Sequence, residues 1–180
     1  MKRLTLLRHA KSDWDDPVAR DFDRPLNRRG QRAALLMGQY ARDRAMNFET
    51  LVASPAVRVK QTLDGFFEGY GETLETRWDR RIYLAATGTL IDVLRDIPAG
   101  VEHALMAGHN PGLEDLVLTL VPDDGLNPLR EDVEEKFPTA SLAVLDLDIA
   151  DWSEVDADKA TLVSFTRPRD LDPALGPQAQ

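Results

Sequence analysis

The chain has 180 residues and no cysteine, and this absence excludes several classes of protein. Without cysteine there can be no disulfide framework, no iron–sulfur cluster and no cysteine-ligated zinc. Long apolar runs are also lacking. The N-terminal apolar run stops at Arg8 and His9, too early for a signal-peptide core, and no later segment approaches the roughly 18 apolar residues of a membrane span. We therefore expect a soluble cytoplasmic protein.

The length and composition predict one folded domain. Hydrophobic residues make up 43% of the chain, which is typical of a globular protein and not of a disordered one. A chain of this length can bury one proper core and leaves little room for a second domain. We assign residues 1–166 to this domain. Residues 167–180 contain three prolines, which predicts an extended C-terminal tail. We expect a monomer.

Charge is unevenly distributed along a chain whose formal net charge is −9. Residues 1–32 hold nine basic and five acidic side chains, a net of +4, whereas residues 112–180 hold five and sixteen, a net of −11. An acidic protein is a poor non-specific binder of nucleic acid or of an anionic membrane, so we expect neither partner. The basic N-terminal segment indicates either a local anion site or a surface of ion pairs.

Short apolar runs alternate with amphipathic segments. The runs at residues 4–7, 51–53 and 104–107 predict buried strands, and apolar side chains at helical spacing predict helices after Gly30 and Pro55 and over 90–97 and 113–120. Two further strands, 142–147 and 161–165, are expected to pair with each other. The acidic, proline-containing segment 122–138 is expected to be an excursion outside the core. This alternation predicts an α/β fold, a three-layer sandwich with a mostly parallel central sheet.

Chemically active residues follow three of the predicted strands. Arg8 and His9 end the first, Arg58 lies shortly after the second, and His109 follows the third. In a parallel sheet the carboxyl ends of the strands meet at one edge, where ligands bind. Each residue taken singly has a structural explanation, such as a hydrogen-bonding histidine or a surface arginine. Their joint position at three strand ends predicts one site with two arginines and two histidines.

Such a group of side chains suits a phosphoryl group. Arginine binds phosphate oxygens through paired N–H groups, and nearby cations keep an imidazole neutral and able to act as a nucleophile. Arg58 lies near a predicted helix start, where the helix dipole disfavours a cation unless an anion is bound beside it. The three histidines show no recognised metal-ligand spacing, so we expect no metal and no other cofactor.

At these residues the chain resembles the histidine phosphatase superfamily, which has the phosphoglycerate mutase-like fold. Four motifs carry the resemblance. They are LLRHAKS from Leu6, DRPLN from Asp23 with Gly30 after it, ASP from Ala53 with Arg58 after it, and GHNP from Gly108. The forms RHAKSDW, YLA, GHNPGLE and KFPTAS point further to the SixA-type phosphohistidine phosphatases. The similarity extends over most of residues 1–166.

The resemblance implies a role for each matching residue. His9 would be the nucleophile that becomes phosphorylated, and Arg8, Arg58 and His109 would bind the phosphoryl group, with Ser12 as a further donor. The expected activity is a metal-independent phosphatase reaction through a covalent phosphohistidine on His9. Where the family usually has glycine after the nucleophile this chain has alanine, which is still small.

One departure from the family bears on the substrate. Phosphomutases of this superfamily use a glutamate as proton donor, and residues 79–87 contain none; Asp79 is the candidate acid. A leaving imidazole needs less help from an acid than an alkoxide does, so the departure favours phosphohistidine in a protein. The alternatives are a small-molecule phosphomonoester phosphatase or a phosphomutase on the same fold, and a phosphate-binding module without turnover. The partner is then a phosphorylated protein or a small phosphorylated substrate.

Overall fold

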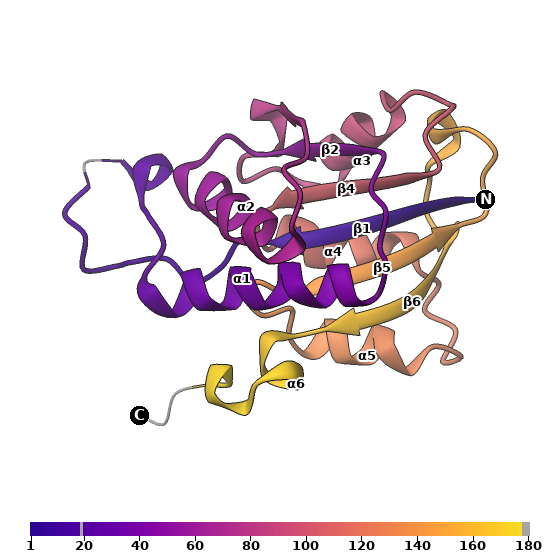
Figure 1. Cartoon of the computed structure of the whole chain (residues 1–180). Coiled ribbons are helices and arrows are strands. Elements are labelled where there is room, and N and C mark those ends of the chain that lie inside the picture. The colour runs from indigo at the N-terminus through magenta and orange to yellow at the C-terminus, as the bar shows by residue number, and fades with distance from the viewer. Residues whose placement is uncertain (19, 178–180) are drawn as a thin grey trace.

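A six-stranded sheet forms the centre of the structure, a computed structural model that describes residues 1–18 and 20–177 (Figure 1). The strand order is β3-β2-β4-β1-β5-β6. β1 pairs in parallel with β4, as β2 does with β4 and β3, whereas β5 is antiparallel to β1 and β6. The strands are β1 (Lys2–Arg8), β2 (Thr50–Ala53), β3 (Thr76–Trp78), β4 (His103–Gly108), β5 (Leu142–Leu147) and β6 (Ala160–Thr166).

Helices cover both faces of this sheet. In Figure 1, α1 (Arg28–Asp43) and α2 (Val57–Tyr70) lie in front of it and α4 (Gly112–Leu120) lies behind. α3 (Thr87–Arg95) and α5 (Pro128–Glu135) share the core of α4. Along β1 the side chains alternate, so that Leu4 and Leu6 enter this core while Leu7 enters the core under α1 and α2. The predicted α/β sandwich with a mostly parallel sheet is confirmed.

The expectation that residues 122–138 lie outside the core is wrong. The segment contains α5, whose start is marked by Pro128 and by the side chain of Asn127, which accepts a hydrogen bond from the N–H of Leu129. Val133 and Phe137 are buried in the core of the α4 face. The sequence analysis missed this helix because many of its side chains are acidic. They lie on its outer face, where water solvates their charge.

The predicted extended tail is also wrong for its described part. Residues 168–171 form the short helix α6 (Pro168–Leu171), and Pro173–Leu175 form a 3₁₀ turn. Asp170 starts the helix by accepting a hydrogen bond from the backbone N–H of Arg167 at 2.8 Å. Arg29 of α1 donates a hydrogen bond to the carbonyl of Gly176 and so fixes the tail over α1. Residues 178–180 of the predicted tail lie outside the described residues.

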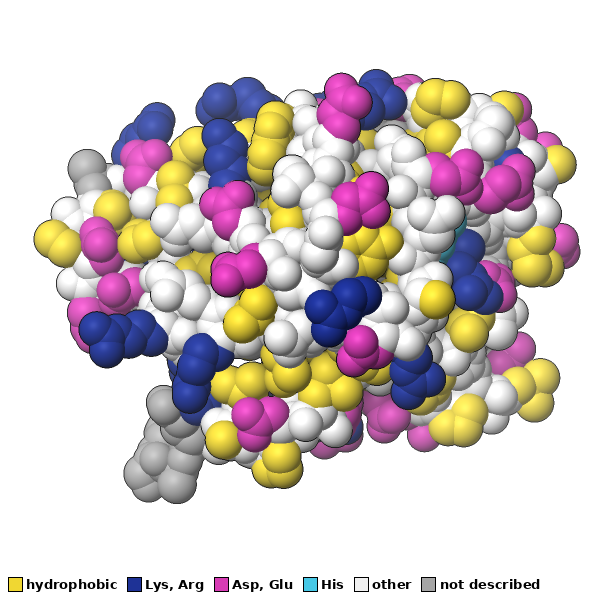
Figure 2. All heavy atoms as spheres, viewed as in Figure 1, with side chains coloured by type: hydrophobic (Ala, Val, Ile, Leu, Met, Phe, Trp, Pro, Cys, Tyr) yellow, Lys and Arg dark blue, Asp and Glu magenta, His cyan; other side chains and the backbone are white. Residues whose placement is uncertain are grey.

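Charged side chains of both signs are dispersed over the face that Figure 2 shows, around isolated apolar side chains. Such mixing keeps the local field small in spite of the net charge of −9. In the described residues no helix combines the length and apolarity needed to cross a membrane.

The contact between α1 and α2 depends on glycine. A Cβ atom at Gly38 would overlap the backbone carbonyl of Phe66, and one at Gly69 would overlap that of Leu35. The missing side chains let the two helix backbones approach closely, and this pair of helices encloses the core that supports one side of the site.

We predict that Gly38→Ala lowers the free energy of unfolding by about 1–3 kcal/mol, because backbone must move to admit the methyl group. Urea unfolding followed by circular dichroism measures the loss. Gly88→Ala is the matched control, since nothing lies within 4 Å of a Cβ at that helical position. Equal stability of the two variants would contradict the close packing of α1 against α2.

Candidate active site

Three strand ends form one corner of the molecule. In the sheet register Arg8 lies opposite Gly108, and Ala53 lies opposite Ala107. The residues that follow these positions therefore meet. The ring centroids of His9 and His109 are 5.4 Å apart. The structure thus brings together the two histidines that the sequence places at separate strand ends.

Backbone hydrogen bonds hold His9 in place. Its N–H donates to the carbonyl of Gly108 at 3.0 Å, and the N–H of Ala10 donates to the Thr62 hydroxyl at 2.9 Å. The ring nitrogen Nδ1 lies 2.7 Å from the carbonyl oxygen of Ala10. A carbonyl oxygen can only accept, so Nδ1 carries the proton and Nε2 of the neutral ring has a free lone pair. Thr62 was not among the site residues expected from the sequence.

His109 lies behind His9 and is only 3% exposed. Its Nε2 is 2.8 Å from the hydroxyl of Ser54, whose oxygen already accepts from the N–H of Ala56. A hydroxyl has one donor and two acceptor sites, so Ser54 can pair with Nε2 in either tautomer of the ring. Nδ1 is buried and has no hydrogen-bond partner among the described residues. In the tautomer that carries the proton on Nδ1, the ring offers an N–H donor suited to an anionic oxygen.

Burial keeps both imidazoles neutral. Desolvation, followed by the charges of Arg8 and Arg58, lowers the pKa of His9 from 6.5 to about 4, although the hydrogen bond to Ala10 opposes the shift. Desolvation and the neighbouring His9 and Arg58 lower the pKa of His109 to about 3. At neutral pH the charged groups of the corner are thus guanidiniums and carboxylates, while the rings keep their lone pairs.

Arg58 is buried and is held by a residue that the sequence analysis did not single out. Its Nη1 and Nη2 donate to the backbone carbonyl and to the carboxylate of Asp21, both at 2.9 Å. The Tyr83 hydroxyl donates to the same carboxylate at 2.8 Å. The hydrogen bond from Tyr83 and the charge of Arg58 outweigh desolvation and leave the pKa of Asp21 lowered. A sequence signal existed, because Asp21 lies just before the DRPLN motif.

Of the three side-chain nitrogens of Arg8, one is held by a hydrogen bond and another has no partner among the described residues. Its Nη1 donates to the carbonyl of Phe137 at 2.8 Å, whereas its buried Nε has no partner among the described residues. Desolvation lowers its pKa, with Arg58 acting in the same direction and Glu114 opposing it. An unpaired buried N–H group is costly, and an anion bound beside it would remove that cost.

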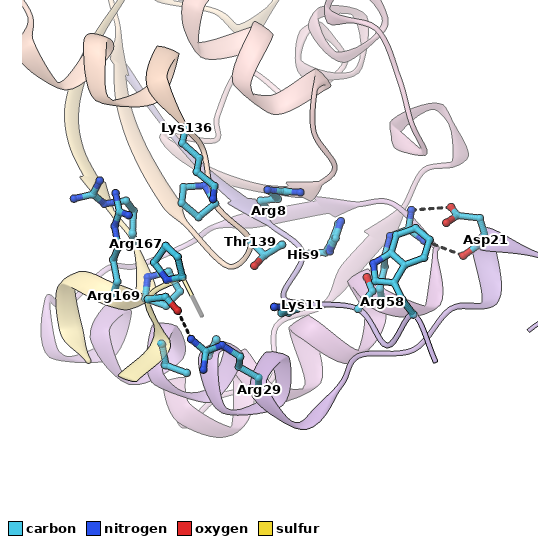
Figure 3. A pocket seen from close by; sticks show the side chains of 18 of the residues that line it. Arg8, His9, Lys11, Asp21, Arg29, Arg58, Lys136, Thr139, Arg167 and Arg169 are labelled. Atoms are coloured by element: carbon cyan, nitrogen blue, oxygen red, sulfur yellow. Dashed lines mark hydrogen bonds and ion pairs between the residues drawn. The ribbon is translucent and has the colours of Figure 1, made fainter. Parts of the chain in front are cut away.

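A cavity of about 600 Å³ opens at this corner (Figure 3). Arg8, His9, Ser12 and Arg58, all expected from the sequence, line it, and Ser12 is buried. His109 does not line the cavity and adjoins it through His9. The walls are strongly cationic, with Asp21 as the one carboxylate among the described lining residues. The lining lysines and arginines are Arg8, Lys11, Arg29, Arg58, Lys136, Arg167 and Arg169.

Asp79, the candidate acid from the sequence, does not line the cavity. Its carboxylate caps a 3₁₀ turn and forms an ion pair with Arg81 at 2.7 Å. The hydrogen bonds from Arg81 lower its pKa, which keeps it ionised. The structure therefore does not bring Asp79 to the histidines. The described residues also contain no group of three or more His, Cys, Asp or Glu side chains that could hold a metal ion.

We predict that the ring of His9 titrates near pH 4 and that of His109 near pH 3, well below the ordinary value of 6.5. The lowered pKa means that each ring stays neutral until the pH falls to these values. Two-dimensional NMR of the histidine ring protons measures both midpoints, and the same protein in denaturant serves as the reference. A His9 midpoint above pH 6 would show that its ring is not desolvated.

Comparisons with known proteins agree with this geometry. The family model described as "Histidine phosphatase superfamily (branch 1)" matches residues 4–82. An uncharacterized Mycobacterium tuberculosis protein, Rv1276c, is 36% identical over 164 residues, which is 91% of this chain and all of that protein.

Two solved structures have the same fold. A SixA protein of Agrobacterium tumefaciens, described as a candidate phosphohistidine phosphatase, has a TM-score of 0.78 at 29% identity and covers 93% of this chain and 98% of its own. A second SixA protein, from Nakamurella, has a TM-score of 0.78 at 26% identity, with 93% and 96% covered. The chain belongs to the histidine phosphatase superfamily, in its SixA-type group, and is a phosphatase.

Proposed function

We propose that this phosphatase hydrolyses phosphohistidine in proteins, without a metal ion, through a covalent phosphohistidine on His9. The hydrogen bond from His9 Nδ1 to the carbonyl of Ala10 carries the proposal. It fixes the tautomer in which Nε2 holds the lone pair, and the low pKa of about 4 keeps that lone pair available at neutral pH.

The reaction has two displacements at phosphorus. In the first, Nε2 of His9 forms a bond to phosphorus as the bond to the substrate imidazole breaks, and the leaving nitrogen takes a proton from water. In the second, water attacks phosphorus as the bond to Nε2 of His9 breaks, which releases inorganic phosphate and restores the neutral ring; the proton that this water loses returns to the solvent that supplied one in the first step. Arg8 and Arg58 would neutralise the phosphoryl oxygens in both steps, while the neutral ring of His109 and the hydroxyl of Ser12 would be additional hydrogen-bond donors.

The carboxylates near the cavity favour an imidazole as the leaving group. Asp21 is the one carboxylate among the described lining residues, and its lowered pKa and its bonds to Arg58 and Tyr83 make it a poor acid. An alkoxide needs a proton donor as it leaves, whereas the imidazole of phosphohistidine needs less help. The SixA proteins of similar structure support the same substrate class.

We predict that His9→Ala abolishes turnover and leaves the fold intact, because within the described residues the ring forms a hydrogen bond only to the carbonyl of Ala10. Stopped reactions of the wild type with ³²P-labelled substrate should give protein-bound phosphate that is labile in acid and stable in base. Mass spectrometry places the label. Labelling of Ser12, or an active His9→Ala variant, would contradict the proposed nucleophile.

The same assays, run in EDTA, test the metal-independent part of the proposal. We expect unchanged rates, because guanidiniums supply the positive charge at the phosphoryl group. Loss of most activity in EDTA and its recovery with magnesium or zinc would show that the cations of the protein are not sufficient.

We predict that Asp79→Asn changes kcat/KM on a phosphohistidine peptide by less than about tenfold, since general acid catalysis is worth about 10²–10⁴ and Asp79 is ionised and bound to Arg81. The control Arg81→Gln breaks the same ion pair and keeps the carboxylate. An alkyl phosphate is the second substrate. A hundredfold loss on both substrates in Asp79→Asn alone would make Asp79 an essential acid and favour a phosphomonoester phosphatase or mutase.

A further inference from the structure

Five cations that the proposed chemistry does not use line the cavity beyond His9. We call them the basic wall: Lys11, Arg29, Lys136, Arg167 and Arg169. They come from distant parts of the chain, namely the turn after β1, the first turn of α1, the end of α5 and the tail around α6. In Figure 3, Arg29, Lys136, Arg167 and Arg169 lie on the side of His9 opposite Arg58.

Most of the basic wall has no acidic partner, although the chain contains 31 acidic residues. Arg167 is paired with Asp170 at 2.9 Å. The structure pairs the other four with no carboxylate in the part of the chain that it describes, and Arg29 donates to the backbone carbonyl of Gly176. Unpaired like charges around one cavity repel one another, and an anionic ligand would relieve that repulsion.

The position of Arg29 strengthens this argument. It lies in the first turn of α1, which contains no acidic side chain, so the positive end of the helix dipole adds to the charge of the wall. Arg29 and Arg169 are also half-buried, which removes part of the water that would screen them. This side of the cavity therefore carries positive charge in addition to Arg8 and Arg58, which would bind the phosphoryl group.

Two exposed apolar side chains also line the cavity. Trp14 is 73% exposed and Leu84 is 56% exposed. Arginine and large aromatic side chains are enriched where proteins contact other proteins. A small ligand enclosed in the cavity would leave these side chains in water, whereas a protein surface pressed on its mouth would cover them.

We propose that the basic wall binds acidic side chains next to the phosphohistidine of a protein substrate. This inference rests on the proposed function and adds the substrate's local chemistry. The phosphoryl group lies at His9, and aspartate or glutamate side chains beside it reach the cations on the far side. Charge complementarity of this kind gives specificity to a phosphatase whose own surface is acidic overall.

The test uses two phosphohistidine peptides that differ only in their flanking residues, glutamate in one and glutamine in the other. For the wild type we expect a kcat/KM at least about tenfold higher on the acidic peptide, falling at high salt. In Lys136→Gln/Arg169→Gln this ratio should fall below about threefold. Neither side chain has a hydrogen bond or ion pair within the described chain, so the fold loses no such contact.

Arg28→Gln is the control, because Arg28 is exposed, adjoins Arg29 and does not line the cavity. The ratio should stay at the wild-type value in this variant. Equal rates on the two peptides, or a ratio that survives in the double variant, would overturn the inference and leave the proposed function standing. No hydrolysis of either peptide would instead refute the proposed function. A tenfold preference for a bisphosphorylated small molecule over both peptides would refute the acidic protein as ligand.

Discussion

The parallel register between β1 and β4 is the constraint on which the site depends. It places Arg8 opposite Gly108 and so brings His9 and His109 to the same edge. The register is firmly specified because both faces of the sheet are buried, with Leu4 and Leu6 in one core and Leu7 in the other. A shift of one residue in the register would turn the side chains of β1 to the opposite faces of the sheet. It would also change the surroundings of Arg8 and His9. Core packing far from the cavity thus sets the geometry of the proposed catalytic residues.

The charge around the cavity is opposite in sign to the net charge of the chain. The protein carries a net charge of −9, yet seven lysines and arginines and one carboxylate line the cavity in its described part. Burying such cations is costly, and the fold offsets part of the cost locally. Arg58 is matched by Asp21, and Arg8 by the carbonyl of Phe137. The remaining positive field is directed at the cavity, where an anion would bind.

Much of the fold could be predicted from the sequence, because apolar runs and helical spacing are visible within short segments. The buried strands, the amphipathic helices after Gly30 and Pro55, and the antiparallel pairing of 142–147 with its neighbour are confirmed. α5 was missed because acidic residues outnumber the two apolar ones that anchor it. The tail was misassigned because its fixation depends on Arg29, which is far away in sequence.

In the site, too, local features of the sequence could be predicted and contacts between distant segments could not. Arg8, His9, Arg58 and His109 could be chosen because each follows a strand, and the parallel sheet then brings the strand ends together. Asp21 lies 13 residues beyond β1, and Tyr83 follows β3, a strand that the sequence analysis did not predict. They reach Arg58 through the folding of two loops, so their contact with it does not follow from strand ends alone, although both lie in or next to motifs that carry the resemblance. Asp79 shows the converse, since its place in the sequence suggested an acid, but Arg81 holds its carboxylate away from the cavity.

In the proposed mechanism, the division between guanidiniums and imidazoles lets one small corner both bind and react. Guanidiniums remain charged across the accessible pH range, so Arg8 and Arg58 can neutralise a phosphoryl group at any pH at which the protein is folded. The imidazoles are desolvated by the same packing that buries those arginines, and this keeps the lone pair of His9 free. Greater solvent access would raise the pKa of His9. It would also weaken the attraction between the arginines and a bound phosphoryl group. Binding and nucleophilicity therefore depend on one property of the fold, the exclusion of water at the ends of β1 and β4.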